Sequence, residues 1–455
     1  MVKITVKDVL ENCDAKLLIG DKDKEIKEGF INSKEVVPGG CFFGIKGSNT
    51  DGSLYYKEAF KNGADICVLS KLKDLDLKGY DDKTVLISND VKKCLQDIAA
   101  YKRSLFKGCV IAVTGSVGKT STKEMIANVL KHKYKVLKTI GNQNSQIGLP
   151  ITILRLTNED VMVLEMGMSS LGHIHNLSVI AKPDIALITN IHENHIESLE
   201  NKENILKAKM EIIDGMNSGY LIVNNDDDYL SKIEENIKDG VKLLTFGIDN
   251  LSNVMPCNIK DDFITTFDIA DIKDFKVNFG TTFIYNALPA FLIGKMLGLS
   301  RGMIKDGINT FITKNHRLEE VNINNNVTLI DDTYNASFDS MKLAIGYLNK
   351  FNKRKILVLA DILELGKESK IIHKKIGKEL SKTNIDYLIT IGKYSKIIAK
   401  EAKKSGFNVK HFKREEKSRS YLKKLIKKDD VILIKGSHGM NLINLVNYLK
   451  EELTL

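Results

Sequence analysis

The stretch CVIAVTGSVGKTSTKEMIANVLKHK, residues 109–133, carries the strongest local signal in this chain. An apolar run leads into a turn with two glycines, and a helix-compatible run follows. In such a turn backbone N–H groups can converge on phosphate oxygens, Lys119 can neutralise their charge, and the Thr120 hydroxyl can ligate Mg²⁺. The spacing is the shorter GxxGK[ST] form, because position 113 is valine where the full Walker pattern has glycine. We predict a phosphate-binding loop; the alternative is a strand–helix turn without a ligand.

Apolar runs of strand length recur after this loop and alternate with helix-compatible segments, which is typical of parallel sheets. The first series is CVIAVTG (109–115), VMVLEMG (161–167), DIALITNIH (184–192) and YLIVNND (220–226). A helical segment at about 285–310 precedes the second series, VTLIDD (327–332), KILVLAD (355–361), YLITIG (387–392) and VILIKG (431–436). Residues 1–106 mix short apolar runs with turns and end in a helical stretch over 91–106. The predicted fold class is α/β.

Polar residues and glycine stand where these runs stop, at Gly115, Glu165, Asn190, Asp332, Asp361 and Lys435. In open α/β sheets ligands bind beyond the carboxyl ends of the strands. Glu165 is a charged residue at the end of an apolar strand, where burial alone would favour an apolar side chain. We therefore predict that it is a metal ligand. We expect His195, beyond the next strand, to contact a metal ion or a phosphate, whereas His192 is equally consistent with an ordinary surface histidine.

Charge is unevenly spread along the chain. Residues 1–310 carry 39 Lys and Arg against 41 Asp and Glu, whereas residues 311–455 carry 29 against 17. A basic C-terminal third suits either nucleic acid or small anionic ligands. No aromatic residues interleave with the lysines at 423, 424, 427 and 428, so we interpret this run as solvated surface and expect no nucleic-acid binding.

Composition also limits the cellular environment. The N-terminal sequence MVKITVKDVLENCD lacks an apolar signal region, and no uninterrupted apolar stretch reaches ~18 residues. We therefore expect a cytoplasmic protein without membrane insertion. The six cysteines lie far apart without a CxxC pair, which predicts reduced, buried thiols rather than disulfides or structural zinc.

Nine motifs, taken in order, resemble the Mur ligase family of ATP-dependent enzymes that form amide bonds. They are TGSVGKTST (114–122), GNQNSQIGLP (141–150), VLEMGM (163–168), NIHENHIE (190–197), KAKMEI (207–212), NHRLE (315–319), DDTYNASFDSM (331–341), ADILELG (360–366) and KGSHGM (435–440). Within the family, DD[ST]YNA and DxxELG resemble the branch that adds the dipeptide D-alanyl-D-alanine to UDP-N-acetylmuramoyl-tripeptide.

This resemblance covers nearly the whole chain and implies three α/β domains. Residues 1–106 would bind the UDP-sugar substrate, residues 107–311 would form a parallel-sheet P-loop ATPase domain, and residues 312–455 would form a Rossmann-like domain for the dipeptide. The implied reaction is the last cytoplasmic step of peptidoglycan precursor synthesis, on which cell-wall biogenesis, cell shape and cell division depend. Its partners would be small-molecule substrates, and we expect a monomer.

The resemblance also assigns roles around ATP. Phosphate contacts would come from Gly115, Ser116, Val117, Gly118, Lys119, Thr120 and Ser121. Thr120 and Glu165 would hold one Mg²⁺, and His195 and Lys209 would serve a second. Asn286 and His316 would flank the adenine. Arg317 and Asp332 would complete the γ-phosphate site when the domains close.

Substrate contacts follow from the same resemblance. The implied residues are Ser33, Lys34, Asn144, Tyr334, Asn335, Lys435, Ser437 and His438, of which the last five would serve the dipeptide. The tripeptide carboxylate would attack the γ-phosphate to give an acyl phosphate, and the dipeptide amine would then attack the acyl carbon and release phosphate. Positioning and charge neutralisation would supply most of the catalysis.

A further implication is that CO₂ carbamylates Lys209. An ammonium of reference pKa ~10.4 repels Mg²⁺, whereas a carbamate is an anion with two of the hard oxygens that Mg²⁺ prefers. Because carbamylation needs the neutral amine, we predict that Lys209 is buried and that its pKa is lowered. The alternative is a solvated lysine, or one paired with Glu203 or Glu211.

The chain departs from the family pattern in four places. Thr282-Phe283 replaces His-Asn of GxHNxxN, Asn32-Ser33-Lys34 replaces DSR, His438 replaces the arginine of KGSR, and Phe338 replaces the proline of YNANP. These departures leave open a diverged paralogue that acts on a related peptide. The sequence also leaves open whether the tripeptide ends in lysine or diaminopimelate.

Other classes explain less of the chain. A P-loop kinase or GTPase accounts for residues 109–226 and leaves the second strand series without a role. A folylpolyglutamate-synthase-like ligase also forms amides with a similar ATP domain. It lacks a separate domain before the phosphate loop, and this chain has one.

Overall fold

The computed structural model describes residues 2–72, 74–192, 199 and 201–454. The chain packs into two compact units. The first unit comprises Met1–Ile191, Glu203–Asn253 and Ile293–Met303, and the second comprises His192–Lys202, Val254–Leu292 and Ile304–Leu455.

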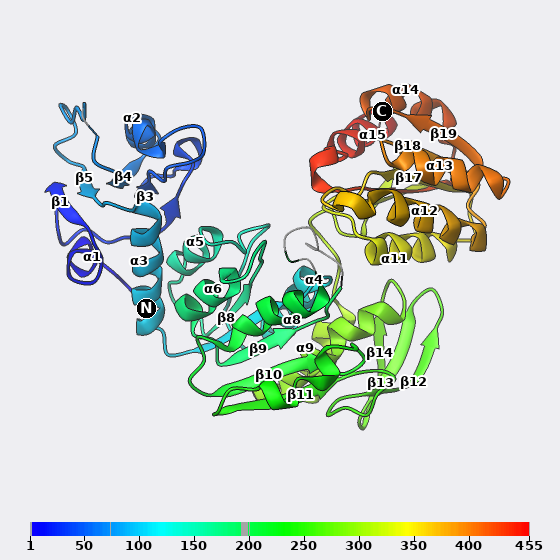
Figure 1. Cartoon of the computed structure of the whole chain (residues 1–455), viewed down its shortest axis with the longest axis horizontal. Helices are drawn as coiled ribbons and strands as arrows, with labels where there is room; N and C mark the ends of the chain where they lie inside the picture. Colours follow the sequence, from blue (N-terminus) through cyan, green and yellow to red (C-terminus); the bar gives the residue numbers. More distant parts are fainter. Residues whose placement is uncertain (1, 73, 193–198, 200, 455) are drawn as a thin grey trace. The chain divides into compact units, whose positions relative to one another are not determined.

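The first unit begins with a five-stranded sheet that is mostly parallel (Figure 1). In spatial order its strands are β1 (Lys16–Ile19), β5 (Thr84–Ile87), β4 (Ala64–Leu69), β3 (Gly40–Phe43) and β2 (Gly29–Phe30), and β1 alone runs antiparallel to its described neighbour. Its helices are α1 (Val6–Asn12), α2 (Tyr56–Lys61) and α3 (Val91–Leu105). The apolar face of α3 closes the core, which confirms the helix predicted over 91–106.

The phosphate-loop strand lies inside a parallel six-stranded sheet of the first unit. In spatial order the strands are β11 (Val241–Phe246), β10 (Gly219–Asn224), β9 (Ile185–Ile188), β6 (Cys109–Thr114), β8 (Val161–Glu165) and β7 (Val136–Lys138). Strands β6, β8 and β9 are almost wholly buried, which explains why they read as continuous apolar runs rather than alternating ones. The four strands predicted between 109 and 226 are therefore confirmed.

Among the described residues, four helices lie between consecutive strands of this sheet and allow them to run parallel (Figure 1). They are α4 (Lys119–Leu130), α5 (Gly148–Leu154), α6 (His173–Ala181) and α8 (Lys202–Met210). Because the strands are parallel, the carboxyl ends of β6, β8 and β9 share one edge of the sheet. The loop after β6, Glu165 at the end of β8 and Asn190 beyond β9 are therefore brought to the same edge.

The second unit contains a three-stranded antiparallel sheet and a six-stranded sheet. The small sheet is β12 (Pro256–Asp261), β13 (Thr265–Ile269) and β14 (Ile272–Val277). The larger one runs β15 (Glu319–Ile323), β16 (Val327–Asp332), β20 (Val431–Lys435), β17 (Lys355–Ala360), β18 (Tyr387–Ile391) and β19 (Asn408–Phe412), with β15 antiparallel to the other strands. All four strands predicted between 327 and 436 are present.

Helices of the second unit cover its larger sheet. They are α11 (Phe338–Asn349), α12 (Ser369–Glu379), α13 (Ser395–Lys404), α14 (Glu416–Leu425) and α15 (Ile443–Thr454). The helical segment predicted at 285–310 is instead two helices, α9 (Ile284–Met296) and α10 (Arg301–Asn309). The break falls at Gly298, whose φ of 70° is left-handed and so ends a helix.

Two composition-based expectations can be compared with the structure. All six cysteines are free thiols, but only Cys41, Cys67 and Cys94 are buried as predicted. Cys13 and Cys109 are partly buried, and Cys257 is exposed because it lies on β12, whose side chains are mostly solvated. Over the described ranges, no helix combines the length and apolar character needed to cross a bilayer.

Candidate active site

The phosphate loop adopts a conformation that only its glycines allow. Gly115 has φ +145°, and a Cβ there would lie 1.9 Å from the Thr189 hydroxyl. Gly118 has φ 84° and caps the N-terminus of α4, where backbone N–H groups and the helix dipole favour an anion. The Lys119 ammonium folds back over the loop and donates to the carbonyls of Gly115 (2.7 Å) and Ser116 (3.2 Å).

Asn190 fastens the loop from the end of the neighbouring strand. Its Oδ1 accepts the Val117 N–H (2.8 Å), and its Nδ2 donates to the Val117 carbonyl (3.0 Å). Its own carbonyl accepts the Ser116 N–H (3.0 Å), and the Thr189 hydroxyl donates to the Val117 carbonyl (2.7 Å). A polar residue just after an apolar strand marks Asn190 as a candidate site residue in the sequence. The sequence does not indicate that its side chain holds the phosphate loop.

Glu165 lies beside the loop helix and is 1% exposed. Its Oε2 accepts a hydrogen bond from the Thr120 hydroxyl (2.8 Å), and its Oε1 accepts one from the Asn144 amide (2.8 Å). Two residues predicted to share a metal ion are thus in contact. Asn144, predicted as a substrate contact, donates to this metal-ligand candidate.

These oxygens fit Mg²⁺. A hydroxyl and a carboxylate are hard donors, and Mg²⁺ is commonly held by one or two protein groups while water and phosphate complete its shell. A site built on protein ligands alone would need three or more His, Cys, Asp or Glu side chains close together. The described residues contain no such cluster. Thr120 and Glu165 offer such a pair of hard donors in contact with each other.

Lys209 is 2% exposed at the end of α8. Its burial, with the Lys119 charge nearby, lowers the pKa of Lys209 well below its usual value. Glu211 accepts the N–H groups of Gly172 and His175, and Glu203 accepts the Tyr229 hydroxyl. The predicted burial and lowered pKa are confirmed, and the structure contradicts the alternative of a solvated lysine.

In the second unit, Asp332 ends β16 and Lys435 ends the adjacent strand β20. The Lys435 ammonium donates to the Asp332 carboxylate (2.6 Å) and to the Asn335 carbonyl (3.0 Å). Lys435 is 1% exposed, and burial lowers its pKa although Asp332 opposes this change. Two predicted residues thus form a buried ion pair, and a third supplies its backbone oxygen to it.

Arg317 lies in a segment whose backbone adopts left-handed conformations on both sides of it. Asn315, His316 and Leu318 all have left-handed φ values between 48° and 61°. The guanidinium stacks 3.8 Å from the centroid of the Tyr334 ring, and its buried Nε has no hydrogen-bond partner in the part of the chain that the structure describes. Strain of this kind often marks functional segments.

The remaining residues around Arg317 are also fixed by contacts within the second unit. His316 Nδ1 lies 2.7 Å from the buried Asp331 carboxylate, and the His316 carbonyl accepts the Tyr334 N–H (3.0 Å). The rings of Tyr334 and His438 are 6.1 Å apart. His316, Arg317, Tyr334 and His438 therefore form one group, although the resemblance assigns them to three different ligands.

Ser437 belongs to a neighbouring turn that depends on Asp361. The Ser437 hydroxyl accepts the Leu363 N–H (2.9 Å), and its own N–H donates to the Asp361 carbonyl (3.1 Å). The Asp361 carboxylate accepts N–H groups at the start of α13, from Lys393, Tyr394 and Ser395. Asp361 is thus a buried structural anion at the strand ends.

The other predicted residues lie elsewhere. Ser33 is buried and its hydroxyl donates to Glu58, whereas Lys34 is exposed. Asn286 is buried on α9. His195 falls outside the described residues.

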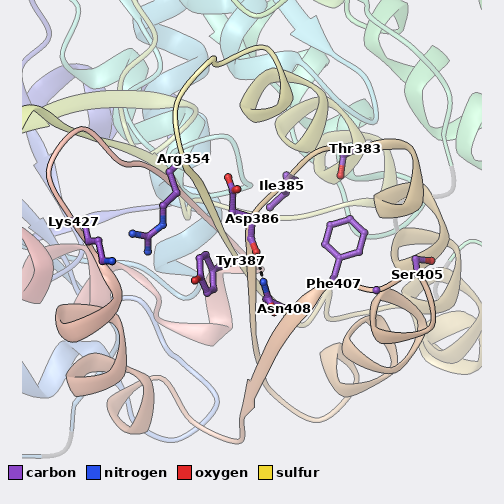
Figure 2. Close-up of a pocket in the computed structure, with 10 residues that line it drawn as sticks. Arg354, Thr383, Ile385, Asp386, Tyr387, Ser405, Phe407, Asn408 and Lys427 are labelled. Carbon is purple, nitrogen blue, oxygen red and sulfur yellow. Dashed lines mark hydrogen bonds between the residues drawn. The ribbon is translucent and has the colours of Figure 1, made fainter.

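A pocket on the second unit involves none of the predicted residues (Figure 2). It is lined at the amino ends of β17, β18 and β19, whereas Asp332 and Lys435 stand at the carboxyl ends of strands in the same sheet. Its Arg354 guanidinium lies 4.9 Å from the Tyr387 ring centroid and donates to the Leu425 carbonyl (2.7 Å). We assign no role to it.

Sequence comparison identifies the fold around these residues. The Mur ligase middle domain matches residues 113–294, and the Mur ligase glutamate ligase domain matches residues 316–438. The UDP-N-acetylmuramoyl-tripeptide–D-alanyl-D-alanine ligase of Bacillus subtilis is 34% identical over 99% of both chains. The chain belongs to the Mur ligase family.

Solved structures agree with this assignment. This Mur ligase is 27% identical to MurF from Acinetobacter baumannii over 99% of both chains, with a TM-score of 0.87. It is also 27% identical to MurF ligase from Thermotoga maritima in complex with ADP, with a TM-score of 0.78 over 94% of this chain and 98% of the other. The predicted three-domain α/β fold class is confirmed. The boundaries after residues 106 and 311 stay predictions.

The contacts of Asn190 lead to a test of the loop. Asn190→Ala removes two hydrogen bonds to Val117, at about 1 kcal/mol each, so ADP affinity should fall by up to about thirtyfold. Isothermal titration with ADP and Mg²⁺ measures this change. Asn217→Ala, at an exposed asparagine of the same unit, is the matched control and should bind ADP as the parent does. Unchanged affinity in Asn190→Ala would contradict the role given to Asn190.

Proposed function

We infer that this Mur ligase joins D-alanyl-D-alanine to UDP-N-acetylmuramoyl-tripeptide in an ATP-dependent reaction. The observation that carries this inference is a likeness to ligases of that name over the full length of the chain. The phosphate loop, with Thr120 hydrogen-bonded to Glu165, provides the arrangement that such a reaction needs for ATP.

The first step is phosphoryl transfer. The terminal carboxylate of the tripeptide attacks the γ-phosphorus of ATP, the bond to the β,γ-bridging oxygen breaks, and ADP leaves with that electron pair. We propose that residues 115–121 hold the phosphates, with the Lys119 ammonium leaving the loop carbonyls for phosphate oxygens. Thr120 and Glu165 would hold Mg²⁺, which when bound neutralises phosphate charge.

The second step forms the amide. The neutral dipeptide amine attacks the acyl carbon, and the tetrahedral intermediate expels phosphate while the nitrogen loses one proton and keeps the other as the amide N–H. We propose that Lys435, Ser437, His438, Tyr334 and Asn335 recognise the dipeptide. Arg317 is a candidate for the transferred phosphate because its buried Nε has no partner among the residues that the structure describes. Two assignments stay predictions. One gives Asp332 the same role as Arg317, and the other places Asn286 and His316 beside the adenine.

The likeness to the related ligases also supports proposals on substrate contacts, localisation and oligomeric state. Ser33 and Lys34 are proposed to contact the UDP substrate, and Asn144 is proposed to act through Glu165 as well as near the substrate. We propose a cytoplasmic monomer acting on small molecules. A diverged paralogue that takes a related peptide stays the second candidate, because Phe283 and Lys34 depart from the family pattern.

Phosphate release tests the reaction and its nucleotide site together. Purified protein with ATP, Mg²⁺, UDP-N-acetylmuramoyl-tripeptide and D-alanyl-D-alanine should release phosphate, and omission of any one component should abolish release. Lys119→Ala should lower the rate more than about a hundredfold, because phosphate charge is then uncompensated, while UDP-substrate binding persists. Lys131→Ala, at the exposed end of the same helix, is the control. Turnover that is unchanged in Lys119→Ala would remove the phosphate-loop assignment.

We further propose that Lys209 is carbamylated and serves a second Mg²⁺. In this reaction the neutral Nζ attacks CO₂, a C–N bond forms, and a proton is lost to solvent. The burial of Lys209 and its lowered pKa support the neutral amine that the reaction requires. His195 is the proposed companion ligand.

Carbamylation can be observed directly. With ¹³C-bicarbonate, the parent should show a carbamate carbonyl signal in its NMR spectrum, and Lys209→Ala should lack it. Lys209→Ala should also lose most ligase activity, and formate or acetate should restore part of it by occupying the vacated anionic position. Lys207→Ala, at an exposed lysine two residues away, should keep both the signal and the activity. A parent spectrum without the signal would contradict this proposal.

A further inference from the structure

Lys123 is a fully enclosed lysine one turn into the helix that follows the phosphate loop. It is 0% exposed. Its Nζ donates to the Thr139 carbonyl (2.6 Å) and lies 3.0 Å from Glu124 Oε1 and 3.7 Å from Glu165 Oε2. An ammonium removed from water costs several kcal/mol unless its partners compensate. A lysine that only formed an ion pair with Glu124 could do so at the surface, so the burial of Lys123 needs another explanation.

Thr139 connects this lysine to Glu165 in a second way. The Thr139 hydroxyl accepts the Glu165 backbone N–H (2.9 Å), while the Thr139 carbonyl accepts the Lys123 ammonium. Thr139 is itself 0% exposed. One residue therefore holds both the main chain of Glu165 and the cation beside its carboxylate.

The direction of the Glu165 carboxylate depends on this arrangement. Neutral donors, Thr120 and Asn144, bind its two oxygens, and Lys123 is the cation within 4 Å of it among the described residues. An ammonium at 3.7 Å attracts a buried carboxylate more strongly than a neutral donor does. Lys123 stands near the oxygen that Thr120 also contacts, which is the side where a shared metal ion would sit.

We propose that Lys123 is a positioning residue for the metal site and acts through Glu165. Together with Thr139 it keeps the carboxylate turned toward Thr120, so that the two oxygens are ready for a divalent cation. The inference rests on the proposed nucleotide function and names a residue that the sequence motifs did not single out. A nearby ammonium also repels a metal ion, but Glu124 at 3.0 Å offsets that charge. The orienting effect should therefore dominate.

Mn²⁺ binding with ADP tests this role without turnover. Free Mn²⁺ is measured by electron paramagnetic resonance as protein with saturating ADP is titrated. Lys123→Met keeps the length of the side chain and removes its charge, and it should weaken Mn²⁺ binding about tenfold, as loss of an outer support of a metal ligand commonly does.

Lys102→Met is the matched control. Lys102 is also buried, at 2% exposed, and donates to a backbone carbonyl, that of Leu154 (2.7 Å), in the same unit. Both substitutions remove a buried ammonium and should lower thermal stability. Only Lys123→Met should weaken Mn²⁺ binding, while Lys102→Met should stay within about twofold of the parent.

A second variant covers the case in which Lys123→Met does not fold. Thr139→Val removes the hydroxyl that accepts the Glu165 N–H and should weaken Mn²⁺ binding about threefold, in the same direction. Suppose that the parent binds Mn²⁺ with ADP. If neither foldable variant weakens Mn²⁺ binding, or if Lys102→Met weakens it as much as Lys123→Met does, the positioning role is wrong while the nucleotide site stands. A parent that does not bind Mn²⁺ with ADP would overturn both.

Discussion

A carboxylate buried at the end of a strand has to be surrounded by hydrogen-bond donors, because a lone buried charge is strongly unfavourable. Glu165 is in this position, and separate segments hold it: Thr120 of α4 and Asn144 before α5 donate to its carboxylate, and Thr139 after β7 accepts its backbone N–H. Satisfying one charge therefore aligns the helix that follows the phosphate loop with the edge of the sheet. Asn190 fastens the loop from the other side, through Val117.

Three buried lysines around the predicted site residues show how partners determine what a buried amine can do. Lys123 is held by a carbonyl and two carboxylates. Lys435 is held by Asp332 and a backbone carbonyl, and burial still lowers its pKa. Lys209 instead faces the charge of Lys119, which adds to the effect of burial and lowers its pKa further. Of the three, Lys209 has the environment that suits reaction with CO₂.

Much of the fold follows from residue pattern alone. Buried parallel strands such as β8 and β20 read as apolar runs, and the glycines together with Lys119 are enough to mark the phosphate loop. Strand β12 was missed because its side chains are mostly exposed and carry no periodic apolar signal. The break between α9 and α10 was missed because a single glycine inside an apolar helical pattern does not mark its own φ.

Within the site, residue types were easier to predict than contacts. Glu165 is visible because a charged residue ends an apolar run, but its partners are distant in sequence, and nothing in the pattern pairs Asn144 with it. Lys123 follows a threonine in a helix and reads as ordinary solvated charge, so only its burial reveals it. The pairing of Lys435 with Asp332 likewise depends on two strands, β20 and β16, that are far apart in the chain and adjacent in the sheet.

The proposed mechanism requires that ATP activate the tripeptide carboxylate as an acyl phosphate. An isotope transfer experiment tests it most directly, with both oxygens of the terminal carboxylate of UDP-N-acetylmuramoyl-tripeptide labelled with ¹⁸O. In the presence of ATP, Mg²⁺ and D-alanyl-D-alanine, each released phosphate should carry one ¹⁸O atom, because the carboxylate oxygen that attacks phosphorus leaves with it. Phosphate that carries no ¹⁸O while the amide product accumulates would contradict the account.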